Sequence, residues 1–251
     1  MSALLDLSPG LALFAAAACF LAGAVRGFAG FGLSAIAMAM LATFVAPIEL
    51  IPVFWFLEMS ASLILMRGGW ADADRPAALM LVLGATMGLP IGLGLSLTLD
   101  ATLSKTVALL LVIGLALMQL SRLRLPVLAT RPGTVASGFS AGIVTGLAGV
   151  GGMLIALYTL ARDLPARRMR GTLNIYLLGS GIIGLGIHLV IGTMTPEAAT
   201  RGLALILPTL AGVFAGKALF TPRWERWYRP ACLVLLIVLA ISGLLRLALT
   251  A

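Results

Sequence analysis

The chain has few of the residues on which soluble proteins and enzymes depend. Charged residues make up only 10% of its 251 positions, whereas soluble domains carry about 25%. It contains no HExxH metal motif, no phosphate loop and no cluster of carboxylates in an apolar segment, so an embedded enzyme or an ATP-driven pump is disfavoured, and neither cofactor nor metal is expected. Cys19 and Cys232 lie in apolar runs, as small buried hydrophobes do. The single histidine, His188, is interpreted as polar packing or a proton relay.

What the chain has instead is long apolar runs. Apolar residues account for 61% of the sequence, and the mean hydropathy is +1.12. Six of the eight runs have about the 20 residues that a helix needs to cross a bilayer, and two are longer. Because none shows the alternation of a membrane barrel strand, the sequence predicts an all-α polytopic membrane protein. The runs cover residues 11–46, 49–66, 76–99, 102–121, 133–161, 171–191, 200–221 and 230–250.

The chain is basic, with a formal net charge of +8. Its basic residues stand in short loops between apolar runs, so no nucleic acid is expected as a partner. If both long runs return to the side from which they came, fourteen of the seventeen Lys and Arg residues fall on one side, and Lys105, Arg201 and Arg246 on the other. Single crossings would divide them almost evenly. The positive-inside rule therefore predicts a cytoplasmic basic side and two termini on the outer, periplasmic face.

A glycine motif occurs twice, once in each long run. Residues 23–32 read GAVRGFAGFG and residues 142–151 read GIVTGLAGVG, and six positions recur at an offset of 119. The similarity predicts two repeats, 11–122 and 133–248, within one integral domain that spans 1–251. Each repeat holds one glycine-broken segment and three spans, an odd number of crossings, so the second is predicted to be inverted relative to the first. Matching breaks in two such halves indicate the binding site of a transporter.

The geometry of the glycine-broken segments stays open from the sequence. Residues 11–27 and 30–46 form either two short full spans or a re-entrant hairpin. A break in the helix frees N–H groups that attract an anion, whereas the alternative role for these glycines is close helix packing. In the re-entrant geometry Arg26 lies at membrane depth, where its planar guanidinium suits sulfonate or carboxylate oxygens. In the other geometry it is an interfacial arginine.

Glu58 lies in the middle of an apolar run, where a carboxylate is expensive. It is a candidate for binding a coupling proton, or for pairing with Arg26 in the empty state. The alternative is a structural hydrogen bond to a neighbouring helix. In the second repeat Thr145 stands at the position of Arg26, and Tyr176, with Asn174 nearby, at that of Glu58. The charges are therefore not duplicated, and the second repeat offers neutral donors.

Two elements carry a resemblance to a known family. The GFxGFG-type element at 27–32 and the GxxxGxxGxGG element at 142–152 open two four-segment halves. Over about residues 11–248 the chain resembles the TauE/SafE sulfite exporter family of bacteria, archaea and plants. One departure is that GLAGVGGM ends in two glycines where some members have three. The resemblance implies a membrane protein that moves sulfite, sulfoacetate, other organosulfonates or related sulfur-containing anions.

We therefore expect a secondary transporter of small sulfur-containing anions that works by alternating access, with Glu58 as the proton-coupling candidate. An anion channel of the same fold and a transporter of a non-sulfur organic anion are the alternatives. The expected partners are the anion, membrane lipid and a coupling proton, with a homodimer left open, and the expected location is the bacterial inner membrane. The candidate substrate-binding residues are Arg26, Gly27, Phe28, Gly30, Phe31, Gly32, Thr145, Gly146, Gly149, Gly151, Gly152, Asn174 and Tyr176.

Overall fold

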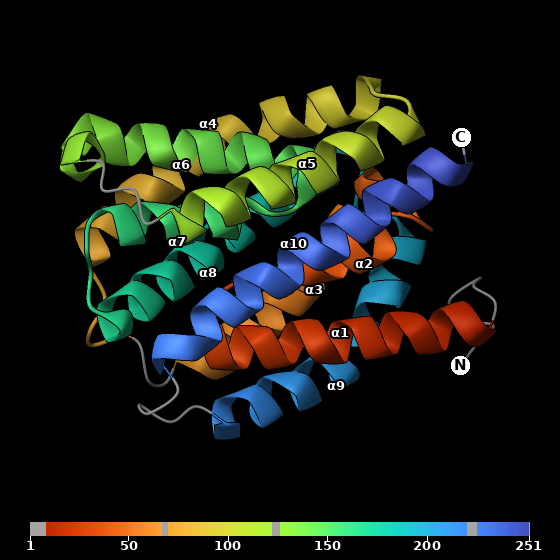
Figure 1. The fold of residues 1–251 in the computed structure, drawn as a ribbon. Helices are drawn as coiled ribbons and strands as arrows, with labels where there is room; N and C mark the ends of the chain where they lie inside the picture. The colour runs from red at the N-terminus through yellow and green to blue at the C-terminus, as the bar shows by residue number, and fades with distance from the viewer. Residues whose placement is uncertain (1–8, 67–69, 122–125, 220–224, 251) are drawn as a thin grey trace.

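The computed structural model describes residues 9–66, 70–121, 126–219 and 225–250, and within these ranges all regular secondary structure is helical. This confirms the predicted all-α polytopic class, because seven of the described helices are long and apolar enough to cross a membrane. Those seven are α1, α3, α4, α5, α8, α9 and α10. The elements in chain order (Figure 1) are α1 (Pro9–Ala29), α2 (Leu33–Leu41), α3 (Pro47–Leu65), α4 (Arg75–Thr98), α5 (Ala101–Leu120), the 3₁₀ turn η3 (Pro126–Ala129), α6 (Arg131–Ala148), α7 (Gly151–Ala161), α8 (Ala166–Ile191), α9 (Pro196–Leu219) and α10 (Glu225–Thr250).

Each of the two long apolar runs divides into a long helix and a short one. α1 has 21 residues and α2 has 9, while α6 has 18 and α7 has 11. At about 1.5 Å per residue, α2 and α7 extend roughly 13 and 16 Å, about half of a bilayer core near 30 Å thick. Two short full spans therefore do not fit these lengths. In both runs a nearly full-length helix is followed by a half-length helix.

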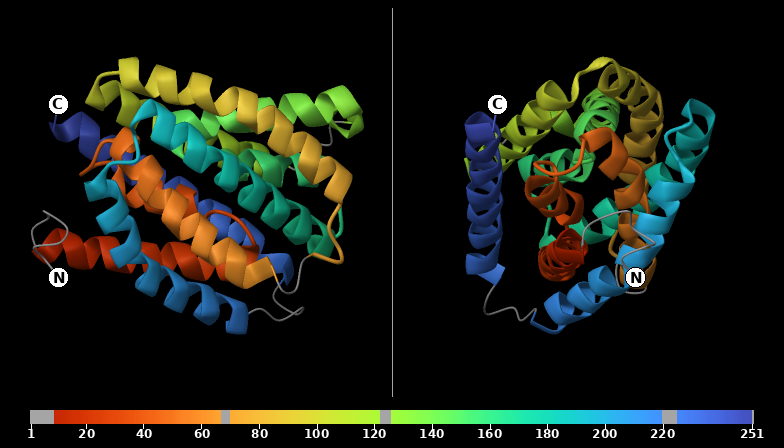
Figure 2. Two further views of the ribbon diagram at one scale, coloured as in Figure 1. Left: turned by 180° about the vertical axis from the view of Figure 1, so that it is seen from behind. Right: turned by 90° about the vertical axis from the view of Figure 1, so that its right-hand side faces the viewer.

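The helices form one bundle in which the start of α1 and the end of α10 lie at the same end (Figures 1 and 2). The opposite end carries the junctions α3–α4 and α7–α8, where Arg75, Arg162, Arg167 and Arg168 stand. Arg26 departs from this pattern, since its side chain is buried within the bundle. Which end faces the cytoplasm stays a prediction. Four of the arginines counted for it, Arg67, Arg122, Arg124 and Arg223, lie outside the described residues.

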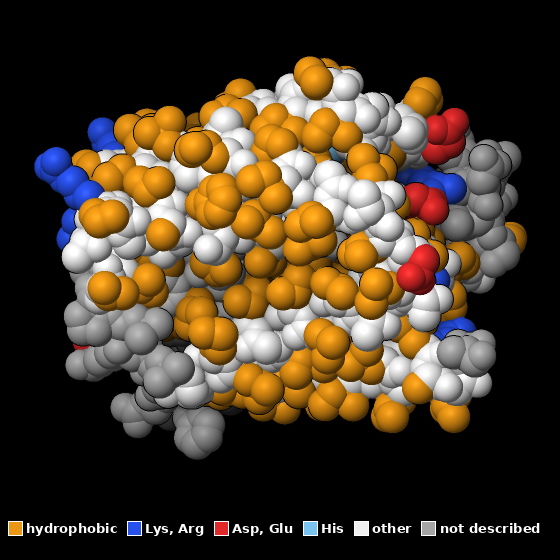
Figure 3. Space-filling view, turned by 90° about the horizontal axis from the view of Figure 1, so that it is seen from above, with side chains coloured by type: hydrophobic (Ala, Val, Ile, Leu, Met, Phe, Trp, Pro, Cys, Tyr) orange, Lys and Arg blue, Asp and Glu red, His pale blue; other side chains and the backbone are white. Residues whose placement is uncertain are grey.

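The surface between the two ends is apolar. Figure 3 shows a broad band of hydrophobic side chains, with charged side chains gathered at the left and right ends of the view. The outward side of α4 illustrates the pattern, because an exposed apolar side chain recurs every four residues along it. These side chains belong to Leu79, Leu83, Met87, Ile91 and Leu95. Such a band is typical of a surface that contacts lipid.

Glycines bring α4 and α6 into backbone contact. A Cβ on Gly88 of α4 would collide with the carbonyl oxygen of Phe139 on α6. In return, a Cβ on Gly142 of α6 would collide with the carbonyl oxygen of Ala85 on α4. The contact between these helices is the most extensive in the described structure. Small residues at a helix interface allow such a close approach, which takes the place of hydrophobic driving force in lipid.

A second interface, between α1 and α9, has the same construction. A Cβ on Gly27 of α1 would collide with the carbonyl oxygen of Val213, and a Cβ on Gly216 of α9 with that of Ala24. The glycine motif matches α1 to α6 at an offset of 119, and Gly88 and Gly92 of α4 match Gly212 and Gly216 of α9 at an offset of 124. The two interfaces are therefore equivalent, and each joins the broken helix of one half to the third long helix of the other. The inversion of one half relative to the other stays a prediction.

Candidate functional site

Three glycines in left-handed backbone conformations make the two helix breaks. Gly30 and Gly32 separate α1 from α2 with φ values of +84° and +89°, and Gly149 separates α6 from α7 with φ of +69°. A Cβ makes this conformation unfavourable, so glycine is the residue that fits it. The motif glycines that precede them, such as Gly27 and Gly146, lie instead in the helix–helix interfaces.

Arg170 of α8 lies over the first break. Its Nη2 atom donates to the carbonyl oxygen of Gly27 at 2.9 Å and also to that of Phe28. These carbonyls belong to the last turn of α1, which has no intrahelical donors for them, so a cation there is favourable. A Cβ on Gly30 would come within 2.7 Å of the Arg170 Cγ atom. Glycine at this position therefore leaves room for the arginine as well as for the break.

Arg26 is fully enclosed, with 1% of its side chain exposed. Its Nη2 atom donates to Ser62 Oγ on α3 and to Asn174 Oδ1 on α8, each at 3.1 Å, and its Nη1 atom donates to the Gly30 carbonyl. Asn174 Nδ2 in turn donates to the Ser62 carbonyl at 3.0 Å. One guanidinium thus joins the first break to helices from both halves. An arginine this deep is expensive unless paired, and its pairing partner is Glu58.

Glu58 lies between Arg26 and the start of α2. Its Oε2 atom is 3.4 Å from Arg26 Nε, and since neither atom takes part in a hydrogen bond, their attraction is purely electrostatic. Its Oε1 atom accepts from Ser34 Oγ at 2.8 Å and from Ser34 N at 3.3 Å. Ser34 is in the first turn of α2, where the helix dipole favours a negative charge. Fifteen per cent of the Glu58 side chain is exposed, and that part lines a cavity.

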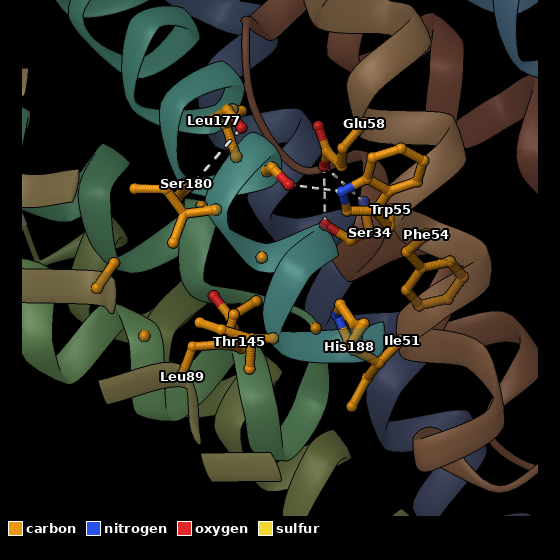
Figure 4. Close-up of a pocket in the computed structure, with 18 of the residues that line it drawn as sticks. Ser34, Ile51, Phe54, Trp55, Glu58, Leu89, Thr145, Leu177, Ser180 and His188 are labelled. Atoms are coloured by element: carbon orange, nitrogen blue, oxygen red, sulfur yellow. Dashed lines mark hydrogen bonds between the residues drawn. The ribbon is translucent and has the colours of Figure 1, made fainter. Parts of the chain in front are cut away.

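The cavity lies at the centre of the bundle, between α3, α4, α8 and the second break (Figure 4). It offers about 80 Å³ to the centres of water molecules, which is enough for several waters or a small anion. Its walls are mostly apolar, with polar side chains at a few points, as in typical small-molecule sites. The lining residues whose side chains can form hydrogen bonds are Ser34, Trp55, Glu58, Thr86, Thr145, Tyr176, Ser180 and His188.

The second break contributes a neutral wall to this cavity. Thr145, Gly149 and Gly152 line it, and α7 begins there without a side-chain cap. Thr145 Oγ1 donates to the Ala141 carbonyl at 2.7 Å. Tyr176, at the position equivalent to Glu58, is 2% exposed. Glu58 is thus the one carboxylate among the described residues that line the cavity.

His188 lies where the cavity approaches the end of the bundle that holds the chain termini. Its Nδ1 atom is 2.7 Å from Thr193 Oγ1, just beyond the end of α8. Thr193 lines a second hollow at that end, together with Glu49 and Arg201, whose Oε2 and Nη1 atoms are 3.2 Å apart. The His188–Thr193 contact therefore stands between the central cavity and this outer hollow.

The structure divides the predicted substrate-binding residues into three groups. One group lines the cavity with Glu58, and it consists of Thr145, Gly149, Gly152 and Tyr176. A second group surrounds the Arg26–Glu58 pair and the first break, and it consists of Arg26, Phe28, Gly30, Gly32 and Asn174. The last group packs within the bundle, and it consists of Gly27, Phe31, Gly146 and Gly151.

Among the lining residues with hydrogen-bonding side chains, sequence reasoning missed four, Ser34, Trp55, Thr86 and Ser180. None belongs to a motif, and each lies alone in an apolar run. One signal was present on α8, where Tyr176, Ser180 and His188 stand at multiples of four residues and share one side of the helix. A polar stripe along an otherwise apolar span indicates a side that faces a cavity rather than lipid.

These features define a multi-pass helical membrane protein with a partly polar cavity at the meeting point of its two halves. Residues 15–243 match the family described as sulfite exporter TauE/SafE, which is most of the chain. The chain belongs to the TauE/SafE sulfite exporter family, a family of membrane transporters for sulfur-containing anions such as sulfite, and the resemblance seen in its glycine elements is thereby confirmed. Separate searches of curated proteins and of solved structures gave no match.

Proposed function

We propose that this protein is a secondary transporter that carries sulfite, sulfoacetate or another organosulfonate by alternating access, coupled to protons through Glu58. The observation that carries the proposal is the central cavity, where the second helix break and Glu58 meet. Family membership supports the substrate class, and the cavity supplies a place for one small anion between the two halves. Substrate and ion sites at the interface of two repeats are typical of secondary transporters.

The proposed anion site has two parts. Thr145 and Tyr176 supply neutral hydroxyls, and the uncapped first turn of α7, which contains Gly152, supplies backbone N–H groups and a partial positive charge. Arg26 supplies the formal positive charge, from behind Glu58. Sulfite and sulfonate oxygens accept hydrogen bonds from the helix N–H groups, from Thr145 once its hydroxyl turns away from the Ala141 carbonyl, and from Arg26 once Glu58 moves aside. The apolar walls around them strengthen each contact by excluding water.

We further propose that residues 11–122 and 133–248 are inverted repeats, and that alternating access moves units that each contain helices of both repeats. The equivalent glycine interfaces, α4 with α6 and α1 with α9, support this proposal. Each interface joins elements of both halves, and so a rigid unit for the motion contains helices of both. By the positive-inside rule, we place the protein in the bacterial inner membrane with both termini outside. A homodimer stays a prediction.

Counterflow in proteoliposomes tests the function. Purified protein is reconstituted into vesicles loaded with unlabelled sulfite, and uptake of radiolabelled sulfite is followed at several outside concentrations. We expect uptake that saturates and that is faster in loaded than in empty vesicles. Uptake that never saturates and ignores the internal anion would identify a channel. Uptake of a carboxylate but of no sulfur anion would refute the substrate class.

A matched pair of variants locates the transport path. Ser180 lines the cavity and donates to a carbonyl of its own helix, Tyr176 O, at 2.7 Å. Ser242 of α10 makes the same kind of bond to Leu239 O at 2.7 Å but is exposed on the outer surface. Ser180→Phe fills the cavity and is expected to abolish counterflow, whereas Ser242→Phe is expected to retain it. Equal counterflow in both variants would show that the transported anion does not pass through the cavity.

A further inference from the structure

Glu58 occupies a set of hydrogen-bond donors that suits an oxyanion. The hydroxyl and backbone N–H of Ser34 point at one carboxylate oxygen, and Arg26 Nε lies 3.4 Å from the other. These donors come from a helix N-terminus and a buried guanidinium, the two groups most often used to bind anions in proteins. The carboxylate thus takes the place of an oxyanion of the same charge.

The contacts of Glu58 are incomplete. Arg26 Nε and Glu58 Oε2 are both buried, and neither atom has a hydrogen-bond partner. The Arg26 side chain as a whole is only 1% exposed. A buried donor without a partner is unfavourable, so a ligand oxygen that accepts from it is favoured there. The same carboxylate borders the cavity, and an anion there reaches Arg26 only after Glu58 has moved.

We propose that the carried anion displaces Glu58 from Ser34 and Arg26, and that the displaced carboxylate takes up one proton. This inference rests on the function proposed above and specifies its coupling. A monovalent anion, the Glu58 carboxylate and the Arg26 guanidinium together carry one net negative charge. In an enclosed site that charge is unfavourable, and one proton from water, bound to Glu58, removes it. One proton then moves with each monovalent anion.

The surroundings of Glu58 single it out as the group that takes the proton. The described charged or titratable side chains that face it or share its cavity are Arg26 on α1, and Tyr176 and His188 on α8, with Arg170 of α8 over the nearby break. The lining residues of α2, α4, α6 and α7 are neutral. His188 is at the far side of the cavity, bonded to Thr193, and Tyr176 and the arginines do not gain a proton near neutral pH.

Calorimetric titration of the purified protein with methanesulfonate tests the proposal, because the charge of this anion is constant between pH 5.5 and 8. Titrations in two buffers of different ionisation enthalpy give the protons taken up. We expect about one proton per anion in the wild type and none in Glu58→Gln. At pH 8 the variant is expected to bind at least about tenfold more tightly, because it has no competing carboxylate and no like charge beside the anion.

Two further variants serve as controls. Glu49→Gln removes another carboxylate of α3, one that pairs with Arg201 outside the cavity, and is expected to behave as the wild type. Arg26→Gln/Glu58→Gln removes both charges and is expected to bind no anion. If Glu58→Gln does not fold, the wild type alone still tests the proposal, because anion binding without proton uptake would overturn it.

The possible outcomes separate this proposal from the function on which it rests. Binding to the wild type without proton uptake, or with equal affinity in Glu58→Gln, would overturn the displacement and leave transport of sulfur anions standing. Proton-linked binding of acetate, with none of methanesulfonate or sulfite, would support the displacement and overturn the substrate class. Failure of the wild type and of Glu58→Gln to bind any of these anions would overturn the displacement itself.

Discussion

The glycines at the α4–α6 and α1–α9 interfaces allow a prediction that depends only on packing. In Gly88→Ala the new methyl group meets the carbonyl oxygen of Phe139, which is backbone and cannot rotate away. α4 and α6 must therefore separate along their most extensive contact, and overpacking of this kind costs about 1–3 kcal/mol. A Cβ on Gly114 of α5 meets nothing within 4 Å. Gly114→Ala is therefore expected to gain up to about 1 kcal/mol from the better helix propensity of alanine.

The assay is reversible unfolding of purified protein in mixed micelles, with the free energy of unfolding read from the denaturant midpoint. Gly88→Ala is expected to fall below the wild type, and Gly114→Ala to equal or exceed it. Gly212→Ala, at the equivalent position of the second half, is expected to lose a similar amount because its Cβ meets the carbonyl oxygen of Phe20. Equal stabilities for Gly88→Ala and Gly114→Ala would refute the packing argument.

Three other substitutions have expected outcomes in the same assay. Arg26→Met leaves the Glu58 carboxylate partly buried and unpaired and should cost about 3–5 kcal/mol, most of which Arg26→Met/Glu58→Leu should recover; an equally unstable double variant would contradict this. Trp55→Phe loses the indole hydrogen bond to the Gly181 carbonyl, 2.7 Å long, and should cost about 0.5–1.5 kcal/mol; a neutral result would show that the bond contributes nothing. Gly149→Ala places a side chain at a φ of +69° and should cost about 1–2 kcal/mol; a gain in stability would argue against that backbone conformation.

Much of the architecture was predictable because lipid restricts what a chain can do. Apolar runs near 20 residues must be helices, and the predicted run of residues 76–99 agrees with α4 to within one residue at each end. The repeated glycine motif also predicted that each long run contains a helix break. The division of the first long run into a full and a half-length helix was not predictable, because Leu33–Leu41 and the residues after it have the same apolar character, and only the turn at residues 42–46 ends the helix.

The candidate site was predictable only in part, because a motif does not say which of its glycines bends and which packs. Gly27 and Gly30 are three residues apart, yet one contacts Val213 of another helix and the other adopts a left-handed conformation. From the sequence, the pairing of Glu58 with Arg26 stood beside two other roles, the binding of a coupling proton and a structural hydrogen bond to a neighbouring helix. The role of Ser34 was not visible, because a serine in a helix's first turn finds its partner only through tertiary packing.

The interlocked halves also affect the order in which the protein can be assembled during synthesis. The partner of α1 is α9, which ends at Leu219, 190 residues after the end of α1 at Ala29. At about 5–20 residues per second, the glycine surface of α1 waits roughly 10–40 s for its partner. α4 meets α6 much sooner, so the middle of the chain is expected to fold first and the first and last helices to close around it. We expect a chain truncated after residue 122 to be rapidly degraded in pulse-chase experiments, because both of its glycine surfaces lack a partner.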